Sequence, residues 1–406
     1  MSKTKAARTL GRAGIELLNA ANAATPVSRS GYGALLSFAF GWPSSEAAPL
    51  LLGASALGTV RRARRGDFDA AAGRIALAAT VISWAILGRI MVRDRTSKAA
   101  FSEPLKALLG PDWPGLGGLG PDTDGILRTE LTRRKYATET VKYGPYRSNT
   151  ADIWRRTDLP RDAKSPVLLQ VPGGAWMIGM RRPQSYPMLS YLAEHGWICV
   201  SIGYRVSPKH AWPAHIIDVK RAIAWVKEHI AEYGGDPEFV AITGGSAGGH
   251  LSSLAALTPS IPEWQPGFED ADTSVVAAVP VYGRYDWVDR SGPDRKMFMG
   301  MLQKQIVKSR LREDRQTYRD ASPIHRVRPD APPFFILHGE NDTLIPVGEG
   351  RAFADALRAV STSPVVYAQI PKAQHAFDFF GSAHGRYTAQ AIANFLEWVR
   401  TDRSGH

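Results

Sequence analysis

A serine in a glycine-rich turn is the first group in the chain that could do covalent chemistry. The stretch EFVAITGGSAGGHLSSLAALT, residues 238–258, starts with an apolar run typical of a buried strand and continues with a helical pattern. Between them lies Ser246 in the pattern G-x-S-x-G, in which a sharp turn leaves no room for side chains at Gly244 and Gly248. The turn would hold the hydroxyl at a helix N-terminus, where partial positive charge favours an oxyanion. We therefore expect Ser246 to be a nucleophile; a phosphate-binding P-loop would need a Gly-Lys-Ser/Thr sequence, which the chain lacks.

Asp342 is the carboxylate that we expect to act with this serine. A serine hydroxyl is a weak nucleophile unless a histidine accepts its proton, and the histidine needs a carboxylate that orients it. Asp342 follows the apolar run 333–338, so it lies just past the C-terminal end of an expected strand, where open α/β sheets bind ligands. Glu340 competes for this role, but the turn Ile345-Pro346-Val347 favours Asp342.

His375 is the expected base. In the order serine, acid, histidine, the base follows the acid, and only three histidines do so: His375, His384 and His406. His375 comes just after the last expected strand, whereas His384 opens the last expected helix and His406 ends the chain. Two further histidines are expected to have structural roles: His250 and His338.

The Gly pair in VPGGAW, residues 171–176, is expected to bind the negative charge that develops during acyl transfer. Without side chains, Gly173 and Gly174 let the backbone turn its N–H groups toward a bound carbonyl oxygen. Pro172 has no N–H, so the expected donors are the backbone N–H groups of three residues: Gly174, Ala175 and Ala247. Gly173 and Trp176 are expected to contact the substrate.

The elements that must position these residues alternate along the chain. A leading hairpin begins near residue 135 and is followed by short apolar runs that are typical of strands buried on both faces, at 166–171, 197–204, 238–243, 274–282, 333–338 and 364–370. Helical patterns separate these runs, most clearly at 215–234, 348–360 and 384–400. Strands that alternate with helices predict an α/β fold with a mostly parallel central sheet and helices on both faces.

The first 100 residues contain two apolar stretches, AAPLLLGASALGTV at 47–60 and IALAATVISWAILG at 75–88. Each is shorter than the roughly 20 residues that span a bilayer, but the second extends over 70–92 if its flanking arginines reach the interface. Three arrangements remain open: a membrane hairpin, a helix pair in the interface beside anionic lipid, or a soluble helical cap on the large domain. Positive charge before, between and after the stretches gives no inside–outside asymmetry.

Charge and cysteine content exclude several kinds of partner. The chain has a net charge of +12, but residues 1–100 hold 14 Lys/Arg against five Asp/Glu, which leaves +3 for the remainder. We therefore expect no nucleic-acid partner for the large domain. The single cysteine, Cys199, excludes an internal disulfide and a cysteine-based zinc cluster, and its apolar surroundings predict a buried thiol. The chemistry expected at Ser246 needs neither a metal nor a cofactor.

Composition divides the chain into three regions. We expect a basic, helical N-terminal region at 1–100, a Gly/Pro-rich linker or cap at 101–135, and a catalytic domain at 136–402. The segment 284–325 interrupts the strand–helix rhythm and contains KMFMGMLQKQIV at 296–307. That Met- and Phe-rich stripe is typical of a core helix, but its place on the loop side of the sheet also fits a cap insertion over the site.

In these motifs the chain resembles the α/β-hydrolase superfamily, in its hormone-sensitive-lipase-like branch, and in particular the serine esterases of mycobacteria and related actinobacteria. The resemblance covers roughly residues 137–400 and rests on six motifs in order: DIWRR, GYRVSP, WPAHIID, GGSAGG, HGENDTLIP and HAF. Two positions depart from the branch. Pro172 stands where it usually has the first residue of His-Gly-Gly-Gly, and Gly245 stands where it usually has Asp.

The residues and the resemblance together predict a serine carboxylic-ester hydrolase that acts through an acyl-enzyme on short- to medium-chain acyl esters. The substrate would be a small-molecule or lipid ester. An amidase or formamidase is one alternative, because formamidases of this fold have similar HGGxW and SAG elements. A catalytically silent, membrane-tethered binding protein is another, which an incomplete triad would favour. The region 47–92 predicts membrane association or a cell-envelope location, with a cytoplasmic location as the alternative.

Overall fold

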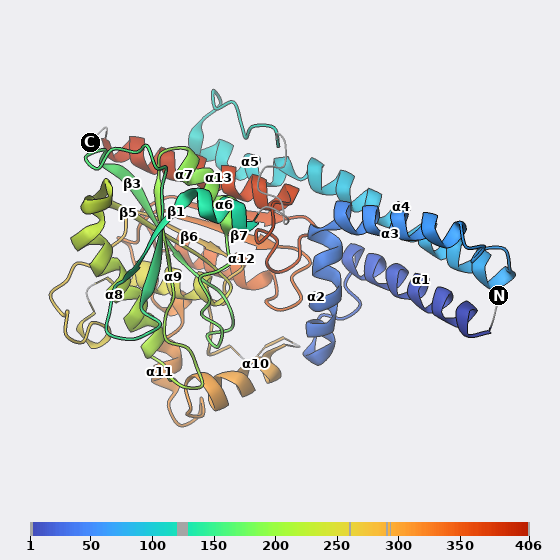
Figure 1. Ribbon diagram of the computed structural model, residues 1–406. Helices are drawn as coiled ribbons and strands as arrows, with labels where there is room; N and C mark the ends of the chain where they lie inside the picture. The colour runs from blue at the N-terminus through green and yellow to red at the C-terminus, as the bar shows by residue number, and fades with distance from the viewer. Residues whose placement is uncertain (1–2, 120–128, 260, 290, 293, 405–406) are drawn as a thin grey trace.

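The computed structural model describes residues 3–119, 129–259, 261–289, 291–292 and 294–404 (Figure 1). Its strands are β1 (Ala137–Lys142), β2 (Thr150–Trp154), β3 (Ser165–Val171), β4 (Ile198–Ile202), β5 (Gly235–Gly245), β6 (Ala278–Val281), β7 (Phe334–Gly339) and β8 (Val365–Ile370). They form one eight-stranded sheet in the order β1-β2-β4-β3-β5-β6-β7-β8. The β1–β2 and β2–β4 pairs are antiparallel and the other pairs are parallel, which confirms the predicted sheet and its leading hairpin.

The central strands are buried on both faces because their apolar side chains alternate between two cores. On β3, Val167 and Leu169 enter one core, and Leu168 enters the other. The first core is covered by α8 (Ala214–His229), α9 (Ala247–Leu257) and α12 (Gly348–Arg358). The second core is covered by α7 (Tyr186–Glu194) and α13 (Ala383–Ser404). This layering places the C-terminal ends of β5, β7 and β8 along one edge of the sheet.

The N-terminal region is helical, and much of it projects from the catalytic domain (Figure 1). The two apolar stretches become α3 (Ala48–Ala63) and α4 (Ala71–Thr96), which pack with α1 (Lys3–Ala24) in an elongated bundle. The apolar helical run Ala71–Leu109 is long enough to cross a bilayer, and 28% of its most apolar window is buried. Helix α2 (Gly31–Glu46) lies where the bundle meets the domain.

The expected linker at 101–135 is more ordered than its composition indicates. Helix α5 (Lys98–Leu109) buries Phe101 and Leu105 completely in the same core as α13. Farther along, the Trp113 indole N–H donates to Asn394 Oδ1 at 3.0 Å, so this stretch lies along α13. Residues 120–128 of the predicted linker lie outside the described residues, and α6 (Thr129–Tyr136) leads into β1.

The segment 284–325 contains α10 (Arg295–Met301), one π-helical turn at Leu302–Ile306, and α11 (Arg315–Asp320). Phe298, Leu302 and Ile306 are buried in the first core, so the Met- and Phe-rich stripe packs as a core stripe.

Candidate active site

The turn at Ser246 lies at the predicted junction of strand and helix. β5 leads into α9 through Ser246, whose φ of 58° and ψ of −120° belong to a region that a non-glycine residue occupies only under strain. A Cβ on Gly244 would lie 2.5 Å from the backbone of Gly248, and a Cβ on Gly248 would overlap the carbonyl oxygen of Val171. The turn can therefore close only with glycine at both positions.

Asp342 and His375 meet from the loops that follow β7 and β8. His375 Nδ1 lies 2.6 Å from Asp342 Oδ2, and both side chains are buried. The other carboxylate oxygen of Asp342 accepts the N–H groups of Leu344 and Ile345 at 2.9 and 2.8 Å. With Nδ1 donating to Asp342, the imidazole keeps Nε2 as the nitrogen that can accept a proton.

The surroundings of Asp342 keep it ionised. Burial alone would raise the pKa of Asp342, but the charge of His375 and hydrogen bonds from His338 and His375 lower that pKa well below its usual range. His338 Nε2 lies 3.4 Å from Asp342 Oδ2 and 3.0 Å from the carbonyl oxygen of Ile345. A permanently charged carboxylate can stabilise the imidazolium that forms when His375 takes up a proton.

The competing candidates from the sequence lie elsewhere. Glu340 pairs with Lys372 Nζ at 3.1 Å near the surface, so its carboxylate is engaged away from His375. His384 is buried against two carboxylates of the N-terminal region, and the terminal histidine lies outside the described residues. The geometry therefore favours Asp342 and His375 as the acid–histidine pair.

Tyr282, just after β6, is a site residue that we did not identify in the sequence. Its ring packs on the His375 imidazole with centroids 4.6 Å apart, and its Oη lies 2.6 Å from the position of a Cβ on Gly245. Tyr282 thus contacts both the His375 ring and the turn that precedes Ser246. Its hydroxyl donates to buried Asp378. Burial raises the pKa of Asp378, and the hydrogen bond from Tyr282 opposes that shift.

The predicted oxyanion loop packs against the nucleophile turn. A Cβ on Gly173 would lie 3.2 Å from Ser246 Cβ, so the two backbones approach closely. Gly174 and Ala175 have φ values of +126° and 52°, which turn the chain back on itself. The Gly173 N–H donates to Gln184 Oε1 at 2.8 Å, which leaves it engaged. Within the described part of the chain, no protein group accepts the N–H groups of the three predicted donors: Gly174, Ala175 and Ala247.

The Trp176 side chain points into the core. It is 3% exposed, its Nε1 donates to His250 Nδ1 at 3.2 Å, and its ring meets Trp287 edge-on at 5.0 Å. His250 stacks on Trp287 at 4.6 Å, and burial lowers the His250 pKa to about 3, so this histidine is neutral. His250 has the predicted structural role, and Trp176, which we expected to contact the substrate, packs in the core beneath the predicted oxyanion loop.

Helix α2 packs directly on the catalytic-domain loop that carries His375. The Phe38 ring meets the His375 imidazole edge-on, with centroids 5.9 Å apart. Trp42 Nε1 donates to the carbonyl oxygen of Ala376 at 2.9 Å, and its indole stacks on Phe380 at 4.7 Å. The N-terminal region is therefore part of the surroundings of His375, which we did not expect from the sequence.

Buried polar contacts fix the position of α2. Thr343, beside Asp342, donates its hydroxyl to the carbonyl oxygen of Ala34 at 3.0 Å. At the end of α2, the Glu46 carboxylate lies 3.3 Å from His384 Nδ1 and accepts the Ser382 hydroxyl at 2.8 Å. Burial alone would lower the pKa of His384, but Glu46 and a second carboxylate on α4 raise it. An imidazolium buried with carboxylates ties α2 to the start of α13.

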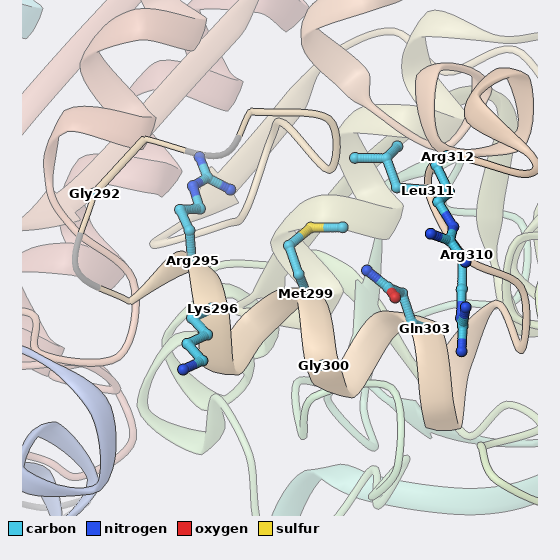
Figure 2. A pocket seen from close by; sticks show the side chains of 9 residues that line it. All are labelled: Gly292, Arg295, Lys296, Met299, Gly300, Gln303, Arg310, Leu311 and Arg312. Carbon is cyan, nitrogen blue, oxygen red and sulfur yellow. The ribbon is translucent and has the colours of Figure 1, made fainter.

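A hollow of about 610 Å³ lies beside α10 (Figure 2). Four cationic side chains line it: Arg295, Lys296, Arg310 and Arg312. Arg295 is paired with Asp289 and Glu349, and the apolar side chains of Met299 and Leu311 also line the hollow. No predicted site residue lines this hollow, so it is separate from the candidate active site.

Among the described residues, no cluster of three or more His, Cys, Asp or Glu side chains could hold a metal ion.

Comparisons with known proteins identify the family of the chain. The sequence profile of the BD-FAE family matches residues 152–357. The probable carboxylic ester hydrolase LipM of Mycobacterium tuberculosis (strain ATCC 25618 / H37Rv) is 48% identical over 397 residues, which cover 93% of this chain and 90% of LipM. Esterase LipC of the same organism is 44% identical over 321 residues, which cover 78% of this chain and 79% of LipC.

A solved structure shows the same fold. The esterase of the planctomycete Thermogutta terrifontis, in a form with bound propionate, is 26% identical with a TM-score of 0.52. The match covers 65% of this chain and 93% of that one. The chain therefore belongs to the BD-FAE family of the α/β-hydrolase superfamily, in the hormone-sensitive-lipase-like branch of the mycobacterial carboxylic ester hydrolases, and it is an enzyme of that class.

Proposed function

We propose that this chain hydrolyses carboxylic esters through an acyl-enzyme on Ser246, with His375 as general base and Asp342 as its partner. The observation that carries the proposal is the 2.6 Å contact of His375 Nδ1 with Asp342 Oδ2, beside a strained serine turn. A buried, ionised carboxylate that orients an imidazole is the arrangement that activates a serine hydroxyl.

The proposed reaction has two halves. Ser246 Oγ bonds to the acyl carbon while His375 Nε2 takes the hydroxyl proton, and backbone N–H groups of Gly174, Ala175 and Ala247 bind the oxyanion. The intermediate collapses, the bond to the alcohol breaks, and the alcohol leaves with the proton from His375. Water then attacks the acyl-enzyme in the same way and releases the acid, which restores Ser246.

We propose that short- to medium-chain acyl groups fit this site best. The aromatic rings of Phe38 and Tyr282 both contact the His375 imidazole, and they supply apolar surface for an acyl chain. Comparing hydrolysis of p-nitrophenyl esters from acetate to palmitate tests this preference. A maximum at palmitate would contradict it.

We further propose that the N-terminal region associates with a membrane through residues 47–92, and so locates the protein at a membrane or in the cell envelope. Large apolar side chains are exposed on both helices of this region, among them Leu57 on α3 and Ile75, Val81 and Ile82 on α4. Flotation of the full chain with lipid vesicles tests this. A protein that stays at the bottom of the gradient would contradict the proposal.

We also propose that the catalytic domain is 136–402, with 284–325 as a cap insertion, and that the N-terminal region 1–100 and the linker or cap 101–135 precede it and pack on it. The segment follows the C-terminal end of β6, which supports its place on the loop side of the sheet.

Labelling with a fluorophosphonate probe tests the nucleophile directly. The reagent phosphonylates an activated serine, so we expect one adduct, on the peptide that contains Ser246. The probe should label the His375→Ala variant much more slowly than the wild type. An unlabelled wild-type chain would contradict the proposal and would favour a binding protein.

A further inference from the structure

We propose that helix α2 forms a path from a lipid bilayer to the active site, so that esters held in the membrane reach Ser246 along this helix. The inference rests on the proposed ester hydrolysis and on membrane association. It adds the source of the substrate and the surface that receives it.

Over the first half of α4 the N-terminal bundle buries small and polar side chains and exposes large apolar ones. The buried positions there recur at helical spacing and are Gly73, Ala76, Thr80 and Ser83, whereas Leu87 and Ile90 are buried farther along the helix. Its exposed positions include Ile75, Val81, Ile82 and Val92. Helix α3 shows the same pattern, because Ser55 and Thr59 are buried and Leu57 and Val60 are exposed. In water the hydrophobic effect favours the reverse, whereas helices in lipid pack through small residues and turn large apolar side chains outward.

Polar groups of the bundle also face inward. The Ser55 hydroxyl on α3 donates to the Glu16 carboxylate of α1 at 2.8 Å and accepts the Trp84 indole N–H of α4 at 3.0 Å. One network thus joins three helices, while each of them also exposes large apolar side chains, such as Leu18 on α1, Leu57 on α3 and Ile75 on α4. Polar side chains that satisfy one another inside a bundle are expected where the outside offers no water.

Helix α2 continues this surface to the active site. Its buried positions are again small or polar and include Ala34, Ser37, Gly41 and Ser44. Its exposed positions are Tyr32, Leu35, Leu36 and Phe40, with Leu36 59% and Phe40 54% exposed. Phe38 lies between these exposed residues in sequence, and its ring meets the His375 imidazole. One short helix therefore has apolar side chains both in solvent-accessible positions and at the histidine.

The position of α2 is fixed, so the path is part of the folded structure. Glu46 at its end is buried with His384 and Ser382, and Trp42 is bonded to the carbonyl oxygen next to His375. A helix anchored by buried ionic contacts at its C-terminal end and by a hydrogen bond one turn earlier keeps Phe38 at the imidazole. An ester that enters beside α2 would meet apolar surface until its carbonyl reaches Ser246.

A lipid surface is the occupant that fits these exposed side chains. They are spread over α1, α2, α3 and α4, and a protein partner would cover one side of such an elongated bundle. Exposed arginines gather at the turn between α3 and α4, namely Arg61, Arg64 and Arg65. Cationic side chains next to apolar helices favour anionic lipid headgroups.

The test compares one ester chemistry in two physical forms. The full chain is assayed on a soluble fluorogenic butyrate ester, and on the same butyrate ester attached to a lipid in phosphatidylcholine–phosphatidylglycerol vesicles. Leu36→Glu and Phe40→Glu place a carboxylate on the outer face of α2. We expect the ratio of vesicle to soluble rates to fall by at least about tenfold in both variants, because a charge enters lipid at high cost.

The matched control is Val360→Glu, which places the same charge on an exposed valine just after α12 and should leave the ratio unchanged. Leu36→Gln is a milder variant at the same exposed position, in case a charge there disturbs folding, and it should lower the ratio in the same direction. Thermal melts show whether each variant is folded.

The outcomes separate this inference from the proposed function. A wild-type chain that hydrolyses neither form of the ester contradicts ester hydrolysis itself. A wild-type chain that hydrolyses both, with an unchanged ratio in Leu36→Glu, Phe40→Glu and Leu36→Gln, overturns the path along α2 and leaves the hydrolysis intact. An equal loss on both forms in the folded α2 variants also overturns it, since α2 would then act only within the site.

Discussion

His375 Nδ1 lies 2.6 Å from Asp342 Oδ2, and this contact joins the loops that follow two neighbouring parallel strands, β7 and β8. Asp342→Asn keeps the shape of the side chain but loses its charge and its preference for the Nδ1–H form of the imidazole. We expect kcat to fall by about a thousandfold or more with a small change in KM. Steady-state kinetics on a soluble ester measure this, with circular dichroism as the check on folding. A loss below about tenfold would mean that Asp342 does not serve His375.

The low pKa of Asp342 predicts how stability depends on pH. Because the folded-state pKa lies below the unfolded value of about 4, the ionised carboxylate stabilises the fold above that pH, and the contribution is lost as pH falls through the folded pKa. The difference in free energy of unfolding between wild type and Asp342→Asn should therefore shrink as pH drops below about 4. Urea denaturation at a series of pH values measures it. A difference that stays constant with pH would contradict the assignment.

Tyr282 occupies the space beside Gly245, so we expect substitutions at these two positions to have non-additive effects on stability and activity. A Cβ on Gly245 would lie 2.6 Å from Tyr282 Oη, so Gly245→Ala should displace the ring from His375 and lower both the melting temperature and kcat. In the double variant Gly245→Ala, Tyr282→Ala the space is free, and we expect the Gly245→Ala change to cost less there than in the wild type. Thermal melts and kinetics of the four chains form the cycle. Additive effects would rule out the proposed contact.

Phe38 predicts a role for the N-terminal region in substrate binding. Phe38→Ala removes apolar surface next to His375 and leaves all three residues of the proposed triad unchanged. We expect KM for a butyrate or hexanoate ester to rise by about three- to thirtyfold, with a smaller effect on acetate, since an acetyl group has little chain to bind. KM values for the ester series measure this. An equal effect on all chain lengths would show that Phe38 acts on the position of His375 instead.

The three residues of the proposed triad could be located in the sequence because each one follows a strand signal. Ser246 lies between an apolar run and a helical pattern, and Asp342 and His375 come just after apolar runs whose C-terminal ends share one edge of a parallel sheet. The requirement for glycine at 244 and 248 could also be predicted, because it arises from the local turn and not from distant contacts. The strands agree with the predicted runs, except that the run 274–282 forms a strand only at Ala278–Val281.

Phe38 and Tyr282 could not be predicted, because their contacts depend on how distant segments pack. No local pattern marks an aromatic residue of α2 as a neighbour of His375. Gly245 was the one available signal for Tyr282, since a glycine in place of the usual Asp leaves a space that another side chain can fill. Helix α5 was missed for a related reason. The Gly/Pro-rich composition after it indicated a linker, yet Phe101 and Leu105, four residues apart, are buried against the domain.

The most direct test of the central claim is hydrolysis of p-nitrophenyl butyrate by the Ser246→Ala chain. The account predicts that removing the single hydroxyl that forms the acyl-enzyme lowers kcat by about a thousandfold or more, while the melting temperature stays close to that of the wild type. A folded Ser246→Ala chain that retains wild-type hydrolysis would contradict the account.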